Sequence, residues 1–303
     1  MEIINYSITE KYDLLPSITT IGVFDGIHLG HKLLFETMEL EKGNLKKMVI
    51  TFFKNPDYSL EKREDNGELM TLEEKISFFE SQNIDYLVLL NEDVLRYSYE
   101  KFNEDVLRKL KVKSIVVGDE FVYGHNKKGN ISTLKIDNDF TVHVCPVLNK
   151  EGVKLSSNSI RKHLLLGEVE KVKDILGSNY KVSGIVKRGA GLGQKLGFPT
   201  ANIDVPSNSF KLFNGVYACY AYVDLKKYLA VVNVGINPTV NTQKFPRIEA
   251  HIIDFNNDIY GKNITVEFIS LLRGEKKFNT VDELIKVVSN DIELVKKGYK
   301  LWK

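Results

Sequence analysis

The chain has 303 residues, of which 43% are hydrophobic and 27% are charged, and its formal net charge at pH 7 is +2. This composition is typical of a globular protein, and the length suits two domains better than one core. The near-balanced charge and the lack of a long apolar run argue against nucleic acid or a membrane as partner, so small-molecule ligands are expected.

The first chemical motif lies between a predicted strand and a predicted helix. Residues 1–15 mix charged and polar residues with apolar ones, which is unlike a signal peptide. An apolar run over 19–23 predicts a strand, and the apolar spacing over 32–40 predicts a helix. The string G-V-F-D-G-I-H-L-G-H between them puts His28 and His31 in the turn and the first helical turn.

This junction predicts a phosphate site. Free backbone N–H groups and the helix dipole favour anions there, and glycines let a ligand approach the backbone closely. Two imidazoles three residues apart can donate hydrogen bonds to the α- and β-phosphates of a nucleotide and stabilise charge as pyrophosphate leaves. The alternative is a plain glycine turn with exposed histidines. A zinc site is disfavoured because H-x-x-H lacks a third ligand nearby.

Helices and strands alternate through the rest of the N-terminal half. Thr71 and Glu74 predict a capping box at the start of one helix, and apolar spacing over 102–110 predicts another. Such alternation is typical of a Rossmann-like domain with a parallel sheet. Ligands of these sheets bind beyond the carboxyl ends of the strands, so the opening motif and residues 118–124 are expected to converge on one crevice. The further strands are predicted over 48–53, 86–90, 114–117 and 141–147.

The segment 155–161, L-S-S-N-S-I-R, opens the next predicted helix. Its serines can simply cap that helix, with Arg161 as a solvated charge. Equally, the hydroxyls, the amides and the guanidinium could form a second phosphate clamp. Both interpretations stay open from this string. Helical spacing continues over 169–176, and we expect the first domain to span residues 1–178.

The remaining residues, 179–303, predict a second domain of a different class. Short β-type runs separated by Gly, Pro, Asn and Asp turns indicate a small antiparallel barrel or sandwich. Thr280 and Glu283 then predict a capping box for a terminal helix that packs on it. Cys145 and Cys219 fall in different domains, which indicates free buried thiols in a reducing cytoplasm. The runs cover 181–186, 216–223, 229–234, 249–255 and 264–270.

The second chemical motif is the stretch 187–202, K-R-G-A-G-L-G-Q-K-L-G-F-P-T-A-N. Its first part is a glycine-rich flap with three cations, but its spacing is not that of a P-loop. Thr200 and Asn202 are oxygen ligands two residues apart, and in an extended segment they could hold Mg²⁺ together with nucleotide phosphates. The alternative is a flexible loop with a Pro-Thr turn.

Glu249 is the candidate base of this domain. Strand alternation puts Glu249 and His251 on one face and their apolar neighbours on the other. A carboxylate on the inner or rim face of a barrel could accept a proton from a substrate hydroxyl. The alternative is an outward, solvated glutamate.

Taken together and in order, these strings resemble the bacterial bifunctional FAD synthetase family, in which riboflavin kinase is joined to FMN adenylyltransferase. Residues 22–31 resemble its HxGH-type motif, residues 155–161 its I-S-S-T-x-I-R motif, and residues 196–202 its kinase motif G-F-P-T-A-N. The kinase pattern continues in Gly215-Val216-Tyr217, Asn233-Val234-Gly235, Asn237-Pro238-Thr239, Glu249, Arg273 and Phe278.

The resemblance implies two consecutive reactions. Glu249 would deprotonate the ribityl 5′-hydroxyl of riboflavin, which attacks the γ-phosphate of ATP, while Thr200 and Asn202 hold Mg²⁺. The FMN so formed would attack the α-phosphate of a second ATP, and His28, His31 and Arg161 would stabilise the phosphates as pyrophosphate leaves and FAD forms.

The resemblance also implies the binding residues of a cytoplasmic enzyme that is a monomer or a weak homo-oligomer. Those expected at ATP or its phosphates are Gly22, Phe24, Asp25, Gly26, Gly30, Ser156, Ser157, Gly189, Gly191, Gly193, Lys195 and Thr200. Those expected at the flavin are Asn55, Glu120, Phe121, Tyr123 and Arg273.

The chain departs from the family pattern in the adenylyltransferase half. Asn55 replaces a His, Glu120 replaces Asp or Asn, and Asn158 replaces Thr. Our hypothesis is that this half remains active but is tuned, for instance to one redox state of the flavin. The rival interpretations are an enzyme with only one working half and a non-catalytic flavin-binding regulator.

Overall fold

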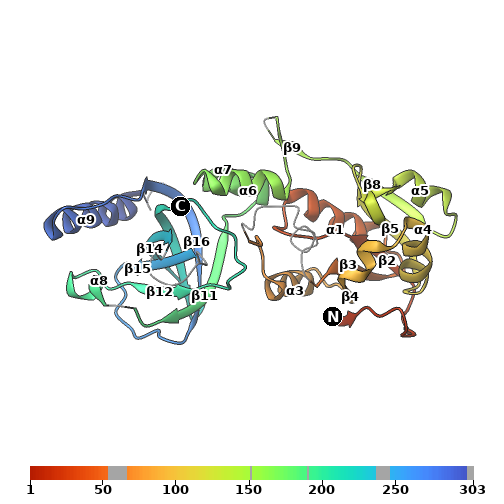
Figure 1. Cartoon of the computed structure of the whole chain (residues 1–303), viewed down its shortest axis with the longest axis horizontal. Coiled ribbons are helices and arrows are strands. Elements are labelled where there is room, and N and C mark those ends of the chain that lie inside the picture. Colours follow the sequence, from red (N-terminus) through yellow and green to blue (C-terminus); the bar gives the residue numbers. More distant parts are fainter. Residues whose placement is uncertain (54–66, 151, 190, 237–245, 299–303) are drawn as a thin grey trace. The chain divides into compact units, whose positions relative to one another are not determined.

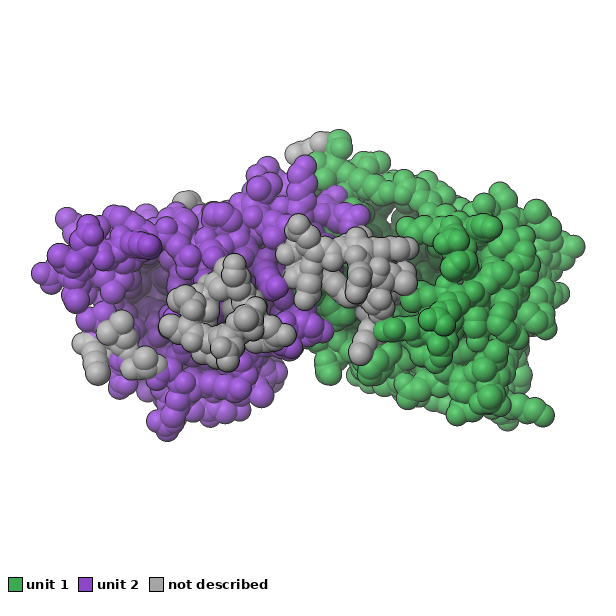
Figure 2. Space-filling view, viewed as in Figure 1, with its two compact units in different colours: residues 1–157 green, residues 158–303 purple. Residues whose placement is uncertain are grey.

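The computed structural model describes residues 1–53, 67–150, 152–189, 191–236 and 246–298. They form two compact units, Met1–Ser157 and Asn158–Lys303, which are coloured separately in Figure 2. The break falls before the domain boundary expected after residue 178. Residues beyond the break associate with the second unit, where the N–H of Phe213 donates to the carbonyl of Leu164 at 3.0 Å. No helix in the described ranges is long and apolar enough to cross a membrane.

The first unit is built on a six-stranded parallel sheet with the order β1-β4-β3-β2-β5-β8 (Figure 1). The N-terminal edge strand β1 was not predicted, whereas the other five strands were. Every residue of β2 is buried, and the chain runs from β2 to β3 on one side and later returns to β5 on the other. The carboxyl end of β2 is therefore a topological switch point. The strands are β1 Glu2–Asn5, β2 Ser17–Ile21, β3 Lys46–Phe52, β4 Tyr86–Leu90, β5 Val112–Gly118 and β8 Thr141–Cys145.

Helices cover both faces of this sheet, as expected of a Rossmann-like domain. Helices α1 (Leu29–Glu41) and α3 (Leu72–Ser81) share one apolar core with the strands, in which Met38 and Phe79 are fully buried. The opposite core contains residues of α4, η2 and α5. These elements and the two short hairpins are α4 Tyr99–Phe102, η2 Asn103–Arg108, α5 Ile131–Ile136, β6 Val122–Tyr123 with β7 Gly129–Asn130, and β9 Asn149–Lys150 with β10 Val153–Lys154.

Two local differences from the predicted elements matter for the site. Strand β2 ends at Ile21, and α1 begins at Leu29, three residues earlier than expected, because His28 caps it. The expected regular helix over 102–110 is instead π-helical from Asn103 to Arg108. Such stretches are rare and often occur at functional sites.

The second unit starts within α6 (Ser157–Leu165), at Asn158, and includes α7 (Val169–Leu176). It continues as a closed antiparallel barrel rather than a sandwich. The strand order is β11-β12-β15-β14-β13-β16. The predicted runs became strands, and β12, which the sequence presented only as part of a motif, was missed. The strands are β11 Lys181–Lys187, β12 Ala201–Asp204, β13 Gly215–Val223, β14 Lys226–Ile236, β15 Pro246–Ile252 and β16 Asn263–Gly274.

The terminal helix α9 (Val281–Gly298) packs on the outside of the barrel, as expected. The hydroxyl of Thr280 accepts the N–H of Glu283 at 3.2 Å, so the predicted cap is present. Val295 is fully buried against Val216 and Val231 of the barrel. Burial of one apolar helical stripe fixes this helix on the strands β13 and β14.

The capping box of α3 provides a test of the first unit. The hydroxyl of Thr71 accepts the N–H of Glu74, and the Glu74 carboxylate accepts the N–H of Thr71. Thr71→Ala should lower the free energy of unfolding of this unit by about 1 kcal/mol, as measured by urea titration. Thr71→Ser keeps a hydroxyl and should lose much less. Equal losses in both variants would contradict a stabilising cap.

Candidate active sites

The N-terminus of α1 presents the two histidines as a stacked pair. His28 is the N-cap, and its Nδ1 accepts the backbone N–H of His31 at 3.3 Å. The two imidazole rings lie 3.7 Å apart between centroids, with an angle of 19° between planes. A Cβ at Gly30 would lie 3.1 Å from the Cε1 and Nδ1 atoms of His28. Glycine at this position therefore leaves room for the ring.

Both imidazoles are neutral at pH 7. Burial, assisted by the positive charge of Lys154, lowers the pKa of His28 from 6.5 to about 4. Burial together with the neighbouring His28 lowers the pKa of His31 well below 6.5. The Nδ1 atom of His31 is buried and has no hydrogen-bond partner within the described ranges. A buried polar atom of this kind is costly, which points to a ligand group at this position.

Buried contacts of Phe24 and Asp25 hold the turn before the histidines in place. Phe24 has a φ of 52°, and a Cβ at Gly22 would lie 3.1 Å from its ring. Asp25, expected at ATP, is 3% exposed, and its Oδ1 accepts the N–H groups of Leu69 (2.8 Å) and Met70 (3.3 Å). In this structure Asp25 thus anchors the turn to the segment that leads into α3.

Lys75 is a buried cation at this site that the sequence analysis missed. It is 3% exposed, and its Nζ donates to the carbonyl of Val23 at 3.3 Å. Its charge also helps to lower the pKa of His31, after burial and His28. The signal was present, because Lys75 lies on the apolar stripe of α3, where a solvated lysine is not expected.

The segment around Lys154 lies near this turn and also contacts the loop after β5. Strand β5 runs beside β2, and Glu120 in the loop after β5 forms an ion pair with Lys154 of β10. Lys154 is close enough to His28 to lower its pKa, and a Cβ at Gly30 would lie 3.8 Å from the carbonyl oxygen of Leu155. Lys154 of β10 thus links Glu120, in the loop after β5, to the surroundings of His28, and the convergence of residues 22–31 with residues 118–124 on one crevice stays a prediction.

An aromatic pair follows Glu120. The rings of Phe121 and Tyr123 are stacked, with centroids 5.5 Å apart and planes at 16°. Tyr123 is only 7% exposed, whereas Phe121 is partly exposed. Of the two rings expected at the flavin, Phe121 is therefore the accessible one.

Four other residues predicted for this chemistry are Arg161, Ser156, Ser157 and Asn55. Arg161 belongs to the second unit, is 9% exposed and holds its guanidinium 5.1 Å from the ring centroid of Phe210. Ser156 and Ser157 stand at the start of α6 and are partly exposed. Asn55 lies outside the described residues, as does the string Asn237-Pro238-Thr239.

In the barrel, strand pairing brings the predicted groups into one row. Asn202 of β12 is paired with Glu249 of β15, and Glu249 is paired with Asn233 of β14. Residues paired directly across neighbouring strands project from the same face. Asn233, to which the sequence analysis gave no role, thus joins the row.

The row lies on the outside of the barrel, which corrects the expectation of an inner or rim face. Val231 lies two residues before Asn233, so it shares its face, and it packs against Val295 of α9. Glu249 projects to that outer side. Its neighbour Ile248, 2% exposed, projects to the other face and fills the interior, which is too small for a ligand as well as side chains.

Glu249 is neither fully solvated nor alone. Its side chain is 20% exposed, and Oε1 forms an ion pair with Arg247, a residue the sequence analysis did not consider. Nδ1 of His251, on the same face, is hydrogen-bonded to the carbonyl of Pro199 at 2.9 Å, and its ring packs edge to face with Phe198. Because a carbonyl only accepts, Nδ1 carries the proton. Arg247, Glu249 and His251 are spaced two residues apart along β15, and this spacing already indicated that they share one face.

The flap glycines lie directly on the predicted metal ligands. A Cβ at Gly189 would lie 2.1 Å from Nδ2 of Asn202, and one at Gly193 would lie 3.2 Å from Oγ1 of Thr200. Glycine is needed here because the flap backbone approaches these side chains closely. Gly191, with a φ of 69°, has open space around it.

These donors fit Mg²⁺ better than a transition metal. Thr200 and Asn202 offer neutral oxygens beside the Glu249 carboxylate, and no group of three His, Cys, Asp or Glu side chains in the described ranges could hold a metal. Mg²⁺ is often held by one or two protein oxygens with substrate phosphates completing its shell.

Arg273, expected at the flavin, is held by α9. Its Nε and Nη2 atoms donate to the carboxylate of Asp291 at 3.1 and 2.9 Å, and Asp291 is 3% exposed. The guanidinium also lies 5.8 Å from the ring centroid of Phe278. A bidentate pair of this kind fixes the direction of the arginine.

The low pKa of His28 can be checked directly by NMR titration of its ring protons. Lys154→Met should raise this pKa above about 4, because a nearby positive charge is removed, yet leave it below 6.5, because burial remains the larger cause. Lys42→Met, at the other end of α1, is the matched control and should not change it. An unchanged value in Lys154→Met would contradict the described geometry.

Comparisons with known proteins agree with this two-part organisation. Residues 11–159 match the FAD synthetase family model, and residues 176–299 match the riboflavin kinase family model. A bifunctional riboflavin kinase/FMN adenylyltransferase of Buchnera aphidicola is 36% identical over 299 residues, covering 94% of this chain and 95% of that protein. The protein of that name in Bacillus subtilis is 34% identical, covering 93% and 92%.

A solved structure also covers the whole fold. A Streptococcus pneumoniae protein named as a macrolide-efflux protein superimposes with a TM-score of 0.89 and 28% identity, covering 98% of this chain and 99% of that one. Its name differs from those of the two relatives, and the likeness concerns the fold. With relatives above 30% identity over nearly the full length, this chain belongs to the family of bifunctional riboflavin kinase/FMN adenylyltransferases.

Proposed function

We propose that the chain phosphorylates riboflavin to FMN in its barrel and adenylylates FMN to FAD in its N-terminal unit, with ATP as the donor in both steps. The observation that carries the proposal is that each unit assembles its own phosphate-handling groups. In one these are the stacked His28 and His31, and in the other the paired Asn202 and Glu249.

In the kinase step, Glu249 takes the proton of the ribityl 5′-hydroxyl, whose oxygen attacks the γ-phosphorus of ATP while the bond to ADP breaks. Arg247 holds the carboxylate in place through their ion pair. Bound Mg²⁺ supplies neutralisation of the phosphate charge, and Thr200 and Asn202 would hold it. The flap that includes Gly191 and Lys195 closes over the nucleotide, and Arg273 contacts the flavin.

In the adenylyltransferase step, a phosphate oxygen of FMN attacks the α-phosphorus of ATP, and the bond to pyrophosphate breaks. His28 and His31 are neutral beforehand, and the arriving phosphates favour their protonated form, so they can donate to the developing charge. Gly26 and Gly30 let the phosphates approach α1. Arg161 stays a sequence-based prediction for the same step.

Flavin recognition in the first unit is assigned to the segment after β5. We assign Phe121, whose ring is partly exposed, to stacking on the isoalloxazine ring. Glu120 is one methylene longer than the Asp of the family pattern, and it forms an ion pair with Lys154. This pair is where we expect the flavin preference to be tuned. We further place the enzyme in the cytoplasm, as a monomer or weak homo-oligomer.

The test separates the two reactions in one chain. Purified protein is incubated with ATP, Mg²⁺ and either riboflavin or FMN, with and without a reductant, and flavins are resolved by chromatography. Glu249→Gln should make no FMN but still convert supplied FMN to FAD, while His31→Asn should accumulate FMN, each losing at least about a hundredfold in one step. Wild-type protein that forms neither product would overturn the proposal and leave a flavin-binding regulator.

Magnesium dependence gives a second check. Asn202→Leu removes one oxygen ligand, so the kinase step should need about tenfold more Mg²⁺, while the adenylyltransferase step of the same variant keeps its requirement. Initial rates of both steps are measured against the Mg²⁺ concentration. Asn208→Leu, outside the paired row, serves as the control. A parallel shift in both steps would argue against Asn202 as a ligand.

A further inference from the structure

We propose that a hydrogen-bonded chain of Arg108, Asp137 and Asn103 positions Tyr123, and through it Phe121, for binding of the flavin in the adenylyltransferase step. None of the first three residues was predicted from the sequence. The inference rests on the proposed function in one respect, which is that Phe121 stacks on FMN.

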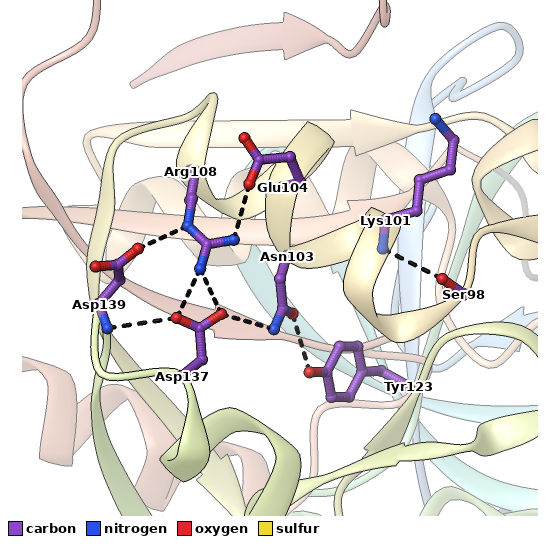
Figure 3. Close-up of polar contacts among 8 residues, drawn as sticks. All are labelled: Ser98, Lys101, Asn103, Glu104, Arg108, Tyr123, Asp137 and Asp139. Atoms are coloured by element: carbon purple, nitrogen blue, oxygen red, sulfur yellow. Dashed lines mark hydrogen bonds and ion pairs between the residues drawn. The ribbon is translucent and has the colours of Figure 1, made fainter.

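The hydrogen-bonded chain runs from Arg108 through Asp137 and Asn103 to Tyr123 (Figure 3). The hydroxyl of Tyr123 donates to Oδ1 of Asn103 at 2.9 Å, and Nδ2 of Asn103 donates to the carboxylate of Asp137 at 3.1 Å. Both oxygens of that carboxylate accept from Nη2 of Arg108 at 2.7 Å. Each link therefore has ordinary hydrogen-bond geometry.

The chain has one direction. A carboxylate can only accept, so Asp137 draws the NH₂ group of Asn103 toward itself and leaves the amide oxygen for Tyr123. Burial raises the pKa of Tyr123, so its hydroxyl stays protonated and donates. Asn103 is 4% exposed, and an unpaired amide there would be costly. The hydrogen bond to Asn103 thereby fixes the orientation of the Tyr123 ring.

Arg108 is fully engaged, but only one of its partners leads inward. Its Nε and Nη1 donate to Asp139 and Glu104, whose side chains are 57% and 69% exposed. The Asp137 side chain is 15% exposed. The two outer carboxylates thus hold the arginine at the surface, where exposed pairs contribute little, and Asp137 links it to the interior.

The aromatic pair has little freedom to move independently. A Cβ at Gly129 would lie 2.7 Å from the ring of Tyr123 and 2.6 Å from the Cβ of Tyr99. Phe102, the residue before Asn103, meets the ring edge on at 5.6 Å. Phe121 stacks on the ring, with centroids 5.5 Å apart. A tilt of Tyr123 therefore shifts the ring that we assign to the flavin.

The π-helical stretch places both ends of the chain. Asn103 opens it and Arg108 closes it, so one irregular turn carries the residue that bonds Tyr123 and the residue that anchors Asp137. Such insertions re-aim side chains relative to a regular α-helix.

The deciding experiment compares two steps in each variant of the full chain. Asn103→Leu keeps the shape of the side chain and removes both hydrogen bonds. We expect the KM for FMN to rise about tenfold, with kcat and the KM for ATP within about twofold, and with the kinase step unchanged. FMN affinity, followed by quenching of flavin fluorescence, should weaken by the same factor. Glu104→Gln, which loosens only the outer side of Arg108, is the matched control and should resemble wild type.

Tyr123→Phe keeps the test valid where Asn103→Leu does not fold. It removes only the hydroxyl and should also raise the KM for FMN. The double variant should have a KM for FMN no higher than that of Asn103→Leu alone, because both substitutions interrupt the same series of hydrogen bonds. Wild-type FMN affinity in Tyr123→Phe, or equal losses toward FMN and ATP in both variants, would overturn the proposal and leave a purely structural network. Wild-type protein that makes no FAD contradicts the proposed function instead, and the fluorescence measurement still decides this inference.

Discussion

Backbone pairing between strands is the interaction on which both sites depend. In the barrel, the hydrogen-bonded register of β12, β15 and β14 puts Asn202, Glu249 and Asn233 side by side. Along the sequence they are far apart, because Glu249 comes 47 residues after Asn202 and 16 residues after Asn233. In the sheet, the parallel pairing of β2 with β5 brings two loops to the same edge. Neither arrangement requires the side chains to attract one another. They are held where the ladders place them, which is a rigid way to position charged and polar groups.

Glycine contributes to both sites through the space that it leaves. Gly30 makes room for an imidazole of its own motif, and Gly189 lets one loop lie on the amide of Asn202. An alanine at either position would force the neighbouring side chain, His28 or Asn202, to move away from the added methyl group. Glycine-rich strings near phosphate sites are often taken as signs of mobility. Here close contact explains these two positions directly.

Much of the fold can be predicted from local patterns in the sequence. The candidate sites can be predicted from them only in part. The capping box at Thr71, the period of two in the barrel strands and the αβ alternation are properties of neighbouring residues, so they can be predicted. Lys75 and Arg247 left local signals, in the apolar stripe of α3 and in the period of two along β15. The role of Lys154 depends on which distant segment lies beside it, and no local pattern carries that information. The outer position of Glu249 was missed for a similar reason, because alternation identifies two faces without saying which one is covered by α9.

The placement of Glu249 on β15 has a consequence for how this family can change over time. Side chains along a strand alternate strictly, so inserting or deleting one residue before Glu249 would turn it into the apolar interior and bring Ile248 or Ala250 outward. Length changes on this strand can be accommodated only in pairs, or by a bulge that restores the parity. The loops between the strands carry no such restriction. Insertions and deletions should therefore occur mainly in the loops, while the paired strands keep their length.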